Sequence, residues 1–392
     1  MTRAFLVVMD SVGIGGAPDA GAYFNGEVPD TGANTVGHIA QSVGLDVPWL
    51  SAMGLGHAVR LASGLEVPGL LRDDWAGAWG AATEVSRGKD TPSGHWELAG
   101  VPVPWDWTYF PKEEPAFPDD IVAEVCRIAG VGGILGNKHA SGTAVIDELG
   151  EEHLRTGWPI CYTSVDSVFQ IAAHEEAFGL ERLIGLCRDL APMLHARKVG
   201  RVIARPFVGG PGTFRRTPHR RDFAIAPPAP TLCDWVQGAG RKVHAVGKIG
   251  DIFSMRGIDT LSKGTDRELM GHLRRLAVEA EEGALVFANF VEFDTDYGHR
   301  RDAAGYARHI EWFSRKLGDL VGLLREGDLL VVTADHGNDP TWVGTDHTRE
   351  RVPVLMHGLG ARELGLMAFA DVGATVAAHL GVDAQGPGKS VI

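Results

Sequence analysis

The chain has 392 residues, with 37 Lys and Arg against 50 Asp and Glu, so its formal net charge at pH 7 is −13. This balance argues against a general binder of nucleic acid or anionic membranes, because like charges repel. A hydrophobic content of 44% and a charged content of 22% are typical of a globular protein and exclude intrinsic disorder. The length favours two domains over one, since single cores stop growing at roughly 250–300 residues.

The cysteines and the N-terminus bear on the compartment. Cys126, Cys161, Cys187 and Cys233 lie far apart with no CxxC pair, which predicts buried apolar thiols in a reducing environment. No charged segment precedes a long apolar stretch at the N-terminus, and no run approaches the ~18–20 apolar residues of a membrane span. We therefore expect a cytoplasmic protein with no membrane association and no obligate protein partner.

The first predicted element is a buried strand over residues 4–9, which are continuously apolar and too few for a surface helix. It is followed by Asp10 and by a glycine-rich turn over residues 13–16. That turn lacks the GxGxxG spacing of a dinucleotide site and follows an acid that would repel a pyrophosphate.

The next informative segment, residues 87–97, reads RGKDTPSGHWE. A threonine directly before a proline predicts that Thr91 is a helix N-cap, with Pro92 at the first helical position. Phosphate on Thr91 would then face the positive end of the helix dipole, so Thr91 is a candidate phosphoryl acceptor. Two alternatives stay open: Thr91 only caps the helix, or Ser93 is the nucleophile.

The amino-acid composition changes at two places, one on each side of the middle of the chain. These are a Pro- and Trp-rich stretch over residues 101–119 and the sequence APPAP at residues 226–230. We interpret them as the boundaries of a domain inserted into a layered α/β core. This insertion contains a basic cluster, residues 197–221, in an otherwise acidic chain. The cluster suits an anionic small molecule, because arginine binds phosphate through its planar fork. The alternatives are a solvated basic loop and, more remotely, a nucleic-acid contact, which no recognisable module supports.

The C-terminal part predicts two more buried strands, over residues 284–293 and 329–334, and a helix over 302–325 with apolar residues at helical spacing. The strands are followed by Asp294 and Asp335. Ligands collect beyond the carboxyl ends of strands in open α/β sheets, so these acids and Asp10 indicate one pocket. A single such acid would be read as a turn former or cap.

Three histidines follow the later acids: His299, His336 and His347. Mixed oxygen and nitrogen ligands suit Mn²⁺ or Zn²⁺ better than Ca²⁺, and six ligands are too many for one catalytic ion with an open position. The set therefore predicts a dinuclear site that favours phosphate oxygens. The alternative for each Asp-His pair is that the aspartate only caps a helix and that the histidine is a structural residue with its hydrogen bonds satisfied.

With these motifs in order, the sequence resembles the bacterial phosphopentomutase family of the alkaline phosphatase superfamily. The resemblance covers essentially the whole chain and rests on residues 8–15, 32–35, 88–97, 162–167, 200–207, 297–302 and 334–339. It implies an α/β fold: an alkaline-phosphatase-like layered core with a mostly parallel central sheet, plus a smaller inserted α/β domain. The core is expected over residues 1–100 and 223–392, and the inserted domain over 101–222.

The resemblance also implies roles for individual residues. Asp10, Asp335 and His336, with the oxygen of Thr91, would hold one Mn²⁺, and Asp294, His299 and His347 the other. Thr91 would be the phosphorylated nucleophile. Contacts with the sugar phosphate are expected from Ser164, Asp166, Arg205 and Arg216, with Lys248 from the core. Asp296 departs from the pattern, because a neutral residue is expected between the metal-binding Asp and His, and this puts the choice of Asp294 over Asp296 in question.

The implied reaction interconverts α-D-ribose 1-phosphate and D-ribose 5-phosphate, and the 2-deoxyribose pair, through a bound bisphosphate. Glucose 1,6-bisphosphate or ribose 1,5-bisphosphate is expected as activator, and sugar phosphates as the partners. The nearest alternative is a metal-dependent phosphatase or phosphodiesterase with the same core. A phosphoglycerate mutase and a non-catalytic metal- or phosphosugar-binding protein are further alternatives.

Overall fold

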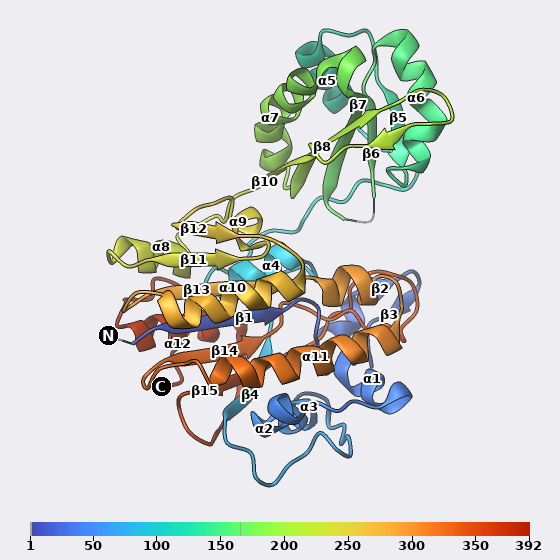
Figure 1. Ribbon diagram of the computed structural model, residues 1–392. Coiled ribbons are helices and arrows are strands. Elements are labelled where there is room, and N and C mark those ends of the chain that lie inside the picture. Colours follow the sequence, from blue (N-terminus) through green and yellow to red (C-terminus); the bar gives the residue numbers. More distant parts are fainter. Residues whose placement is uncertain (1, 165) are drawn as a thin grey trace. The chain divides into compact units, whose positions relative to one another are not determined.

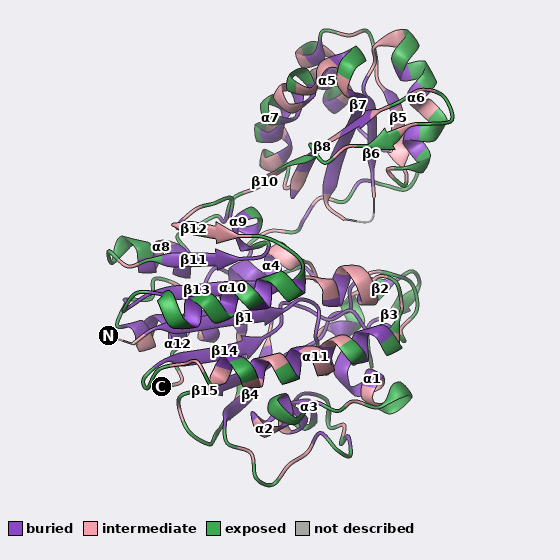
Figure 2. Ribbon diagram, viewed as in Figure 1, coloured by how far each residue is buried: buried purple, intermediate pink, exposed green. Residues whose placement is uncertain are grey.

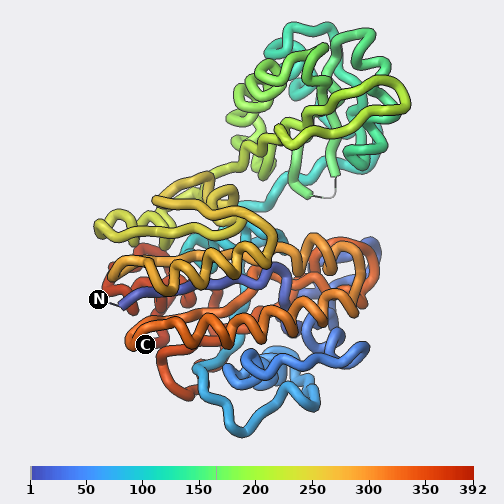
Figure 3. Tube along the Cα trace, in the orientation of Figure 1, coloured from blue at the N-terminus to red at the C-terminus, as the bar shows by residue number. Residues whose placement is uncertain are grey.

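The computed structural model describes residues 2–164 and 166–392, and the chain divides into two compact units. The first unit comprises Met1–Pro104 and Ala226–Ile392, and the second is Trp105–Ile225. Figure 3 follows the chain out of the first unit and back into it. The predicted insertion, 101–222, differs by a few residues at each end. The reason is local pairing: Val103 N–H bonds the Ser86 hydroxyl of the first unit, while Phe223 pairs with Val202 in the second.

An eight-stranded sheet forms the centre of the first unit, in the order β12-β11-β13-β1-β14-β15-β4-β16. Strand β15 runs antiparallel to both of its neighbours, and the other neighbouring pairs are parallel. The strands are β1 Ala4–Met9, β4 Ala78–Thr83, β11 Val243–Val246, β12 Thr260–Ser262, β13 Leu285–Phe290, β14 Leu329–Thr333, β15 Val352–His357 and β16 Arg362–Ala368. A small hairpin pairs β2 Phe24–Asn25 with β3 Val28–Pro29.

Helices cover this sheet, with α10 and α11 in front of it and α12 behind it, packed against α4 and α8 (Figure 1). They are α1 Thr35–Val43, α2 Pro48–Ala52, α3 Leu55–Ser63, α4 Thr91–Leu98, α8 Leu232–Gly238, α9 Ile249–Ile252, α10 Asp266–Glu279, α11 Ala303–Val321 and α12 Phe369–Leu380. Shorter helical turns are η1 Ala20–Ala22 and η3 Phe293–Gly298.

The core lies between these layers: the central strands are buried, the edge strands β12 and β16 are largely intermediate or exposed, and helices α10 and α11 are buried on their inner faces (Figure 2). Every residue of β1, β13 and β14 is buried, as their continuous apolar sequences predict. Helix α11 buries Ile310, Phe313 and Leu317, and Asp302 caps it by accepting the Gly305 N–H. The predicted helix therefore forms, although it ends four residues earlier than expected.

The neighbouring strands β13, β1 and β14 are parallel, so their carboxyl ends lie at one edge of the sheet. Asp10 follows β1 directly, Asp335 follows β14 by two residues, and Asp294 lies in η3, the turn after β13. The expected strand over 284–293 ends at Phe290, because the chain turns into η3 at Phe293. The three aspartates thus share one edge, as the sequence predicts.

The second unit contains its own sheet, in the order β10-β8-β7-β6-β5, with β9 paired to β8. Its strands are β5 Leu135–His139, β6 Ile160–Thr163, β7 Val168–His174, β8 Arg201–Val208, β9 Arg215–Arg216 and β10 Arg221–Ala224. Its helices are α5 Asp119–Ala129, α6 Ala144–Thr156, α7 Leu180–Ala196 and the turn η2 Glu175–Gly179. Buried residues of α5 and α7 form a core cluster with the sheet, and α6 contributes to a second cluster.

Two further observations concern the expectations on thiols and membranes. The four cysteines are free thiols; Cys161, Cys187 and Cys233 are buried as expected, whereas Cys126, on the partly exposed face of α5, is only half-buried. Among the described helices, none combines the length and the apolar character that a bilayer crossing requires.

Candidate active site

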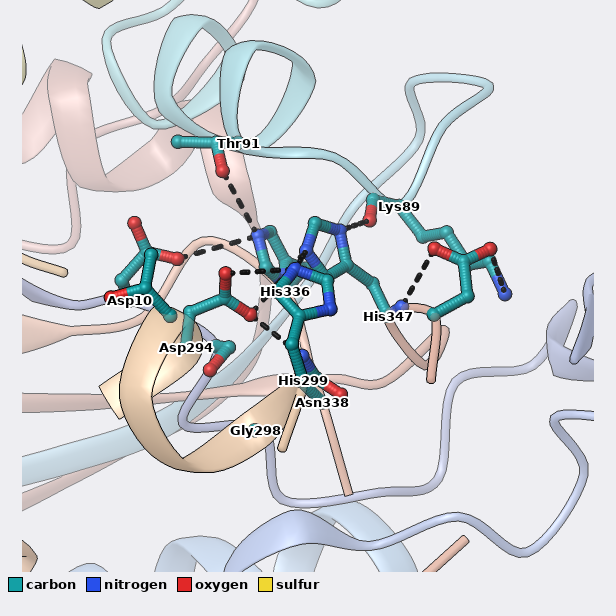
Figure 4. A network of polar contacts seen from close by, with 12 residues as sticks. Asp10, Lys89, Thr91, Asp294, Gly298, His299, His336, Asn338 and His347 are labelled. Atoms are coloured by element: carbon teal, nitrogen blue, oxygen red, sulfur yellow. Dashed lines mark hydrogen bonds and ion pairs between the residues drawn. The ribbon is translucent and has the colours of Figure 1, made fainter. Parts of the chain in front are cut away.

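Two groups of potential metal ligands lie at the carboxyl edge of the central sheet (Figure 4). Asp10, Asp335 and His336 form the first group, and Asp294, His299 and His347 form the second. In each group the potential ligand atoms lie within 4.8 Å of one another. The structure therefore brings together all six residues that the sequence singled out, in the two groups that the resemblance implies.

The three histidines share one tautomer, which their backbone contacts fix. Their Nδ1 atoms lie 2.7 Å from Thr345 O for His299, 3.1 Å from Gly337 O for His336 and 2.7 Å from Lys89 O for His347. A carbonyl oxygen only accepts hydrogen bonds, so each Nδ1 carries a proton that it donates. Each Nε2 is then left to face the acids, which is how metal-binding histidines are oriented in proteins.

The first group is buried and short of hydrogen-bond donors. Oδ1 of Asp10 and Oδ2 of Asp335 accept no hydrogen bond from the described residues, and they lie 3.5 and 3.3 Å from Nε2 of His336. Burial, and then repulsion by Asp335 and Asp294, raises the pKa of Asp10 well above its usual range. Burial lowers the pKa of His336 to about 4, so its ring stays neutral. Two crowded carboxylates with unsatisfied oxygens and a neutral imidazole fit a divalent cation.

In the second group, Asp294 lies between the two histidines. Its Oδ2 is 3.1 Å from His299 Nε2 and its Oδ1 is 3.4 Å from His347 Nε2. Asn338 donates a hydrogen bond to the same Oδ1 at 2.7 Å, which fixes the carboxylate. Burial by itself would raise the pKa of Asp294, but His347 and His299 outweigh it and hold that pKa well below its usual range.

Asp296, the unexpected acid in this loop, points away from both groups. Its carboxylate pairs with Arg300 at 2.9 Å on the surface, and the side chain is 41% exposed, against 7% for Asp294. The structure therefore selects Asp294 as the residue that faces the histidines.

Thr91 begins α4 and points at the first group. Its Oγ1 lies 3.3 Å from Nε2 of His336 (Figure 4). The helix cap is Asp90, whose Oδ1 accepts the Ser93 N–H at 3.0 Å, so the expectation that Thr91 is the N-cap is wrong by one residue. Because Asp90 takes over the capping, the Thr91 hydroxyl stays available for chemistry.

The rival nucleophile, Ser93, is held differently. It is fully buried, and its hydroxyl donates to Oδ2 of Asp90 at 3.0 Å. The next residue of α4, Gly94, lies against the backbone of Asp335, where an added Cβ would be 2.1 Å from the Asp335 carbonyl oxygen. Only glycine permits this approach, which brings the helix that carries Thr91 to the edge of the sheet.

A third group of possible ligands, Asp266, Glu292 and His309, lies behind the loop that carries Asp294. Asp266 is buried, and its carboxylate accepts the N–H groups of Val291 and Glu292. The ring of His309 lies 2.9 Å from the same carboxylate. These oxygens are engaged by the protein, and the group braces the turn from β13 into η3.

Within the second unit, two of the expected sugar-phosphate contacts, Asp166 and Arg205, are held by different partners. Asp166 pairs with Arg201, at 3.1 Å, and not with Arg205. The register of β7 with β8 explains the difference: Val168 pairs with Arg201 and Ala172 with Arg205, which sets Arg205 four residues, about 13 Å, further along the sheet. Arg205 instead donates to Gln170 at 3.0 Å.

The remaining expected contacts are spread over both units. Ser164 is half-buried, two residues before Asp166. Arg216 is exposed on β9, near Gly142 and the Tyr162 hydroxyl. Lys248 is exposed in the first unit. Its positive charge opposes the rise in the pKa of Asp10, but burial and the neighbouring acids outweigh it.

Comparisons with known proteins place this site in a family. The profile of the Metalloenzyme superfamily matches residues 2–384. A protein of Sinorhizobium medicae named phosphopentomutase is 55% identical over the full length of both chains, and a second, from Sinorhizobium fredii, is likewise 55% identical over both full lengths. The chain belongs to the phosphopentomutase family. A solved phosphoglycerate mutase of Leishmania mexicana is 14% identical, with a TM-score of 0.46, and covers 100% of this chain and 97% of its own.

Membership of the phosphopentomutase family makes this chain an enzyme of a metal-dependent superfamily, with the alkaline-phosphatase-like α/β fold that the sequence predicted. The donor sets fit a metal cofactor by an independent argument. Asp10 and Asp335 each have an unsatisfied buried oxygen, and the three histidines, whose Nδ1 atoms face backbone carbonyls, direct Nε2 at the acids.

Sequence reasoning missed the amide residues that orient these acids in the phosphopentomutase site. Asn289 donates to Oδ2 of Asp10 at 2.8 Å, and Asn338 does so for Asp294. One signal was present: Asn289 is a polar residue inside an otherwise apolar buried strand, where a side chain needs a partner. Arg201, the partner of Asp166, was not distinguishable from its neighbours in the basic cluster.

Proposed function

We propose that this chain interconverts α-D-ribose 1-phosphate and D-ribose 5-phosphate, and the corresponding 2-deoxyribose phosphates, through a phosphorylated Thr91. The observation that carries the proposal is the 3.3 Å approach of the Thr91 hydroxyl to Nε2 of His336, beside Asp10 and Asp335. A hydroxyl on the first turn of a helix, next to a buried cation site, suits phosphoryl transfer. The named relatives supply the reaction and the substrate class.

Asp10, Asp335 and His336, with the Thr91 oxygen, would hold one Mn²⁺, and Asp294, His299 and His347 the other. When bound, these cations supply Lewis-acid stabilisation of the phosphoryl oxygens and of the Thr91 oxygen. Carboxylate and imidazole ligands in one site suit Mn²⁺. Glucose 1,6-bisphosphate or ribose 1,5-bisphosphate would act as activator by donating the phosphoryl group that first loads Thr91.

In the first half-reaction, the bond between phosphorus and the Thr91 oxygen breaks. A new P–O bond forms to a hydroxyl of the incoming monophosphate, whose proton is transferred on balance to the released Thr91 oxygen, and the product is a bound bisphosphate. After this intermediate reorients, Thr91 takes up the other phosphoryl group and regenerates the phosphoenzyme. The N-terminal end of α4 favours the phosphate charge, and the Asp90 cap holds that end in place.

Substrate contacts are proposed from both units. In the second unit these are Ser164, Asp166, Arg205 and Arg216, to which the ion pair with Asp166 adds Arg201. In the first unit the proposed contact is Lys248. Guanidinium groups suit the phosphate that is not being transferred, and the Asp166 carboxylate suits sugar hydroxyls.

The rival within the same superfamily is a phosphatase or phosphodiesterase, in which water takes the phosphoryl group from Thr91. The decisive assay incubates the manganese-loaded protein with ribose 1-phosphate and a trace of glucose 1,6-bisphosphate, and follows ribose 5-phosphate and free phosphate together. We expect ribose 5-phosphate with little free phosphate. Stoichiometric release of phosphate would favour the hydrolase, and no turnover with intact metal binding would favour a non-catalytic binder.

The nucleophile is tested with two variants of one side chain. Thr91→Ala should retain manganese binding but lose the transfer reaction and the phosphorylated peptide seen by mass spectrometry. Thr91→Ser keeps the hydroxyl and should keep measurable transfer. Undiminished transfer by Thr91→Ala would reject Thr91 as the acceptor.

A further inference from the structure

Two buried polar side chains adjoin the first metal-ligand group without belonging to it, and only one of them, Asn289, has been described so far, as a donor to Asp10. His95 lies on α4, one turn after Thr91, and Asn289 lies on β13. Neither has any exposed surface. Buried polar groups are costly unless their hydrogen bonds are satisfied, so their contacts indicate what they do.

The contacts of Asn289 define its orientation and the tautomer of His95. The Asn289 Nδ2 lies 2.8 Å from Oδ2 of Asp10 and 3.1 Å from Nε2 of His95. An amide nitrogen only donates, and it carries two protons, so it can serve both acceptors at once. Nε2 of His95 is therefore an acceptor, and the ring proton of neutral His95 is on Nδ1.

That Nδ1 proton is donated to the nucleophile helix, and the second acid lies close to the same nitrogen. Nδ1 lies 2.9 Å from the carbonyl oxygen of Thr91 and 3.1 Å from Oδ2 of Asp335. The ring is stacked on Phe287 at a centroid distance of 6.1 Å and an interplanar angle of 27°, which keeps it in this plane. One chain of contacts thus connects Asp10, Asn289 and His95 to both Thr91 and Asp335.

The chain of contacts also decides which oxygen of each acid remains for a cation. Asn289 occupies Oδ2 of Asp10 and leaves Oδ1 toward His336. The Ser11 N–H occupies Oδ1 of Asp335 at 3.0 Å and leaves Oδ2, which lies between His95 and His336. Each carboxylate is therefore held with one oxygen on the side of the cation.

We propose that His95 and Asn289 are positioning residues, which set Asp10 and Asp335 relative to the helix that carries Thr91. The pair couples the first cation position to the nucleophile through hydrogen bonds, without touching either the cation or the substrate. This inference rests on the proposed function only in taking Asp10 and Asp335 as ligands of a divalent cation.

The test titrates the full chain with Mn²⁺ and follows free Mn²⁺ by electron paramagnetic resonance, with thermal melting to verify folding. Asn289→Leu keeps the volume and removes the donor, and His95→Phe keeps the ring and removes both nitrogens. We expect either change to weaken one of the two manganese positions by about 10–100-fold and to leave the other nearly unchanged. His95→Asn places an amide nitrogen at the position of Nδ1 and should recover part of the loss.

A matched control is His153→Phe in the second unit. His153 is 1% exposed and also uses both ring nitrogens, toward Trp158 O and the His174 N–H. Its replacement should lower the melting temperature and leave manganese binding unchanged. If Asn289→Leu and His95→Phe fold and both bind Mn²⁺ like the unmodified chain, the inference is wrong. If the unmodified chain itself binds no Mn²⁺, the proposed function fails instead.

Discussion

The Nε2 atoms of His299 and His347 lie 3.2 Å apart, on either side of the Asp294 carboxylate. Both rings donate their Nδ1 protons to backbone carbonyls, so two nitrogen lone pairs converge on one place. Such an approach is stable only with a proton or a metal ion between or beside the two nitrogens. The second ligand group therefore requires a positive charge at this place, either a proton on one of the two rings or a metal ion.

This arrangement predicts different roles for Asp294 and Asp296, two aspartates that are close in sequence. Asp294→Asn should weaken the second manganese position by about 100-fold or more, because the carboxylate that faces both histidines is lost. Asp296→Asn should leave both positions unchanged, because that carboxylate pairs with Arg300 on the surface. Calorimetric titration of the two variants with Mn²⁺ distinguishes the residues. A larger loss in Asp296→Asn would reverse the assignment of Asp294.

A buried ion pair holds the segment that leads to Thr91. Arg349 contacts the carboxylates of Glu84 and Asp19 and donates to the carbonyl oxygen of Gly88. Arg349→Met would leave Glu84 buried without its partner, so we expect a loss of about 3–5 kcal/mol in the free energy of unfolding. Urea denaturation measures it. Arg349→Met combined with Glu84→Gln should lose less than the two single changes together, and strict additivity would contradict the coupling.

A pH dependence is expected from the pair of His38 and Asp339. The Nδ1 of His38 lies 2.5 Å from Oδ2 of Asp339, and this hydrogen bond raises the pKa of His38 above its usual value near 6.5. Because the raised pKa favours the protonated ring in the folded state, its contribution to stability is full below about pH 6.5 and disappears as pH rises through the folded pKa.

Denaturation of the unmodified chain and of His38→Gln at pH 5.5, 7 and 8.5 measures this contribution. The difference in unfolding free energy between the two proteins should be largest at pH 5.5 and smallest at pH 8.5. If the difference in unfolding free energy between the two proteins stays constant across these pH values, protonation of His38 contributes nothing to stability.

The strand register of the second unit predicts unequal roles for two arginines. Arg201 pairs with Asp166, whereas Arg205 bonds the neutral Gln170. Arg201→Gln should raise KM for ribose 1-phosphate by about 10-fold or more, the cost of a lost charge-assisted hydrogen bond. Arg205→Gln should raise it less. Steady-state kinetics of both variants measures the two KM values. Equal increases in KM would show that Arg201 and Arg205 contribute equally to substrate binding.

Much of the site could be predicted because it depends on local pattern. The apolar runs that become β1, β13 and β14 are evident in the sequence, and the acids follow them because strand ends in a parallel sheet share one edge. The start of α4 was wrong by one residue, and the strand expected to reach Phe293 ends at Phe290. Asp and Thr are both good helix caps, and the choice depends on which residue keeps an extended backbone, here Asp90 with φ −125° and ψ 155°.

The sequence by itself determined which residues carry chemistry: the acids after buried strands, the histidines that follow them and a threonine before a helix. Only the tertiary structure decided how they act, because that depends on contacts between distant segments. The strand order β13-β1-β14 brings Asp294, Asp10 and Asp335 together, and burial selects Asp294 over Asp296. Backbone carbonyls far along the chain fix the tautomers of His299 and His347, and the pairing of β7 with β8 gives Asp166 its arginine.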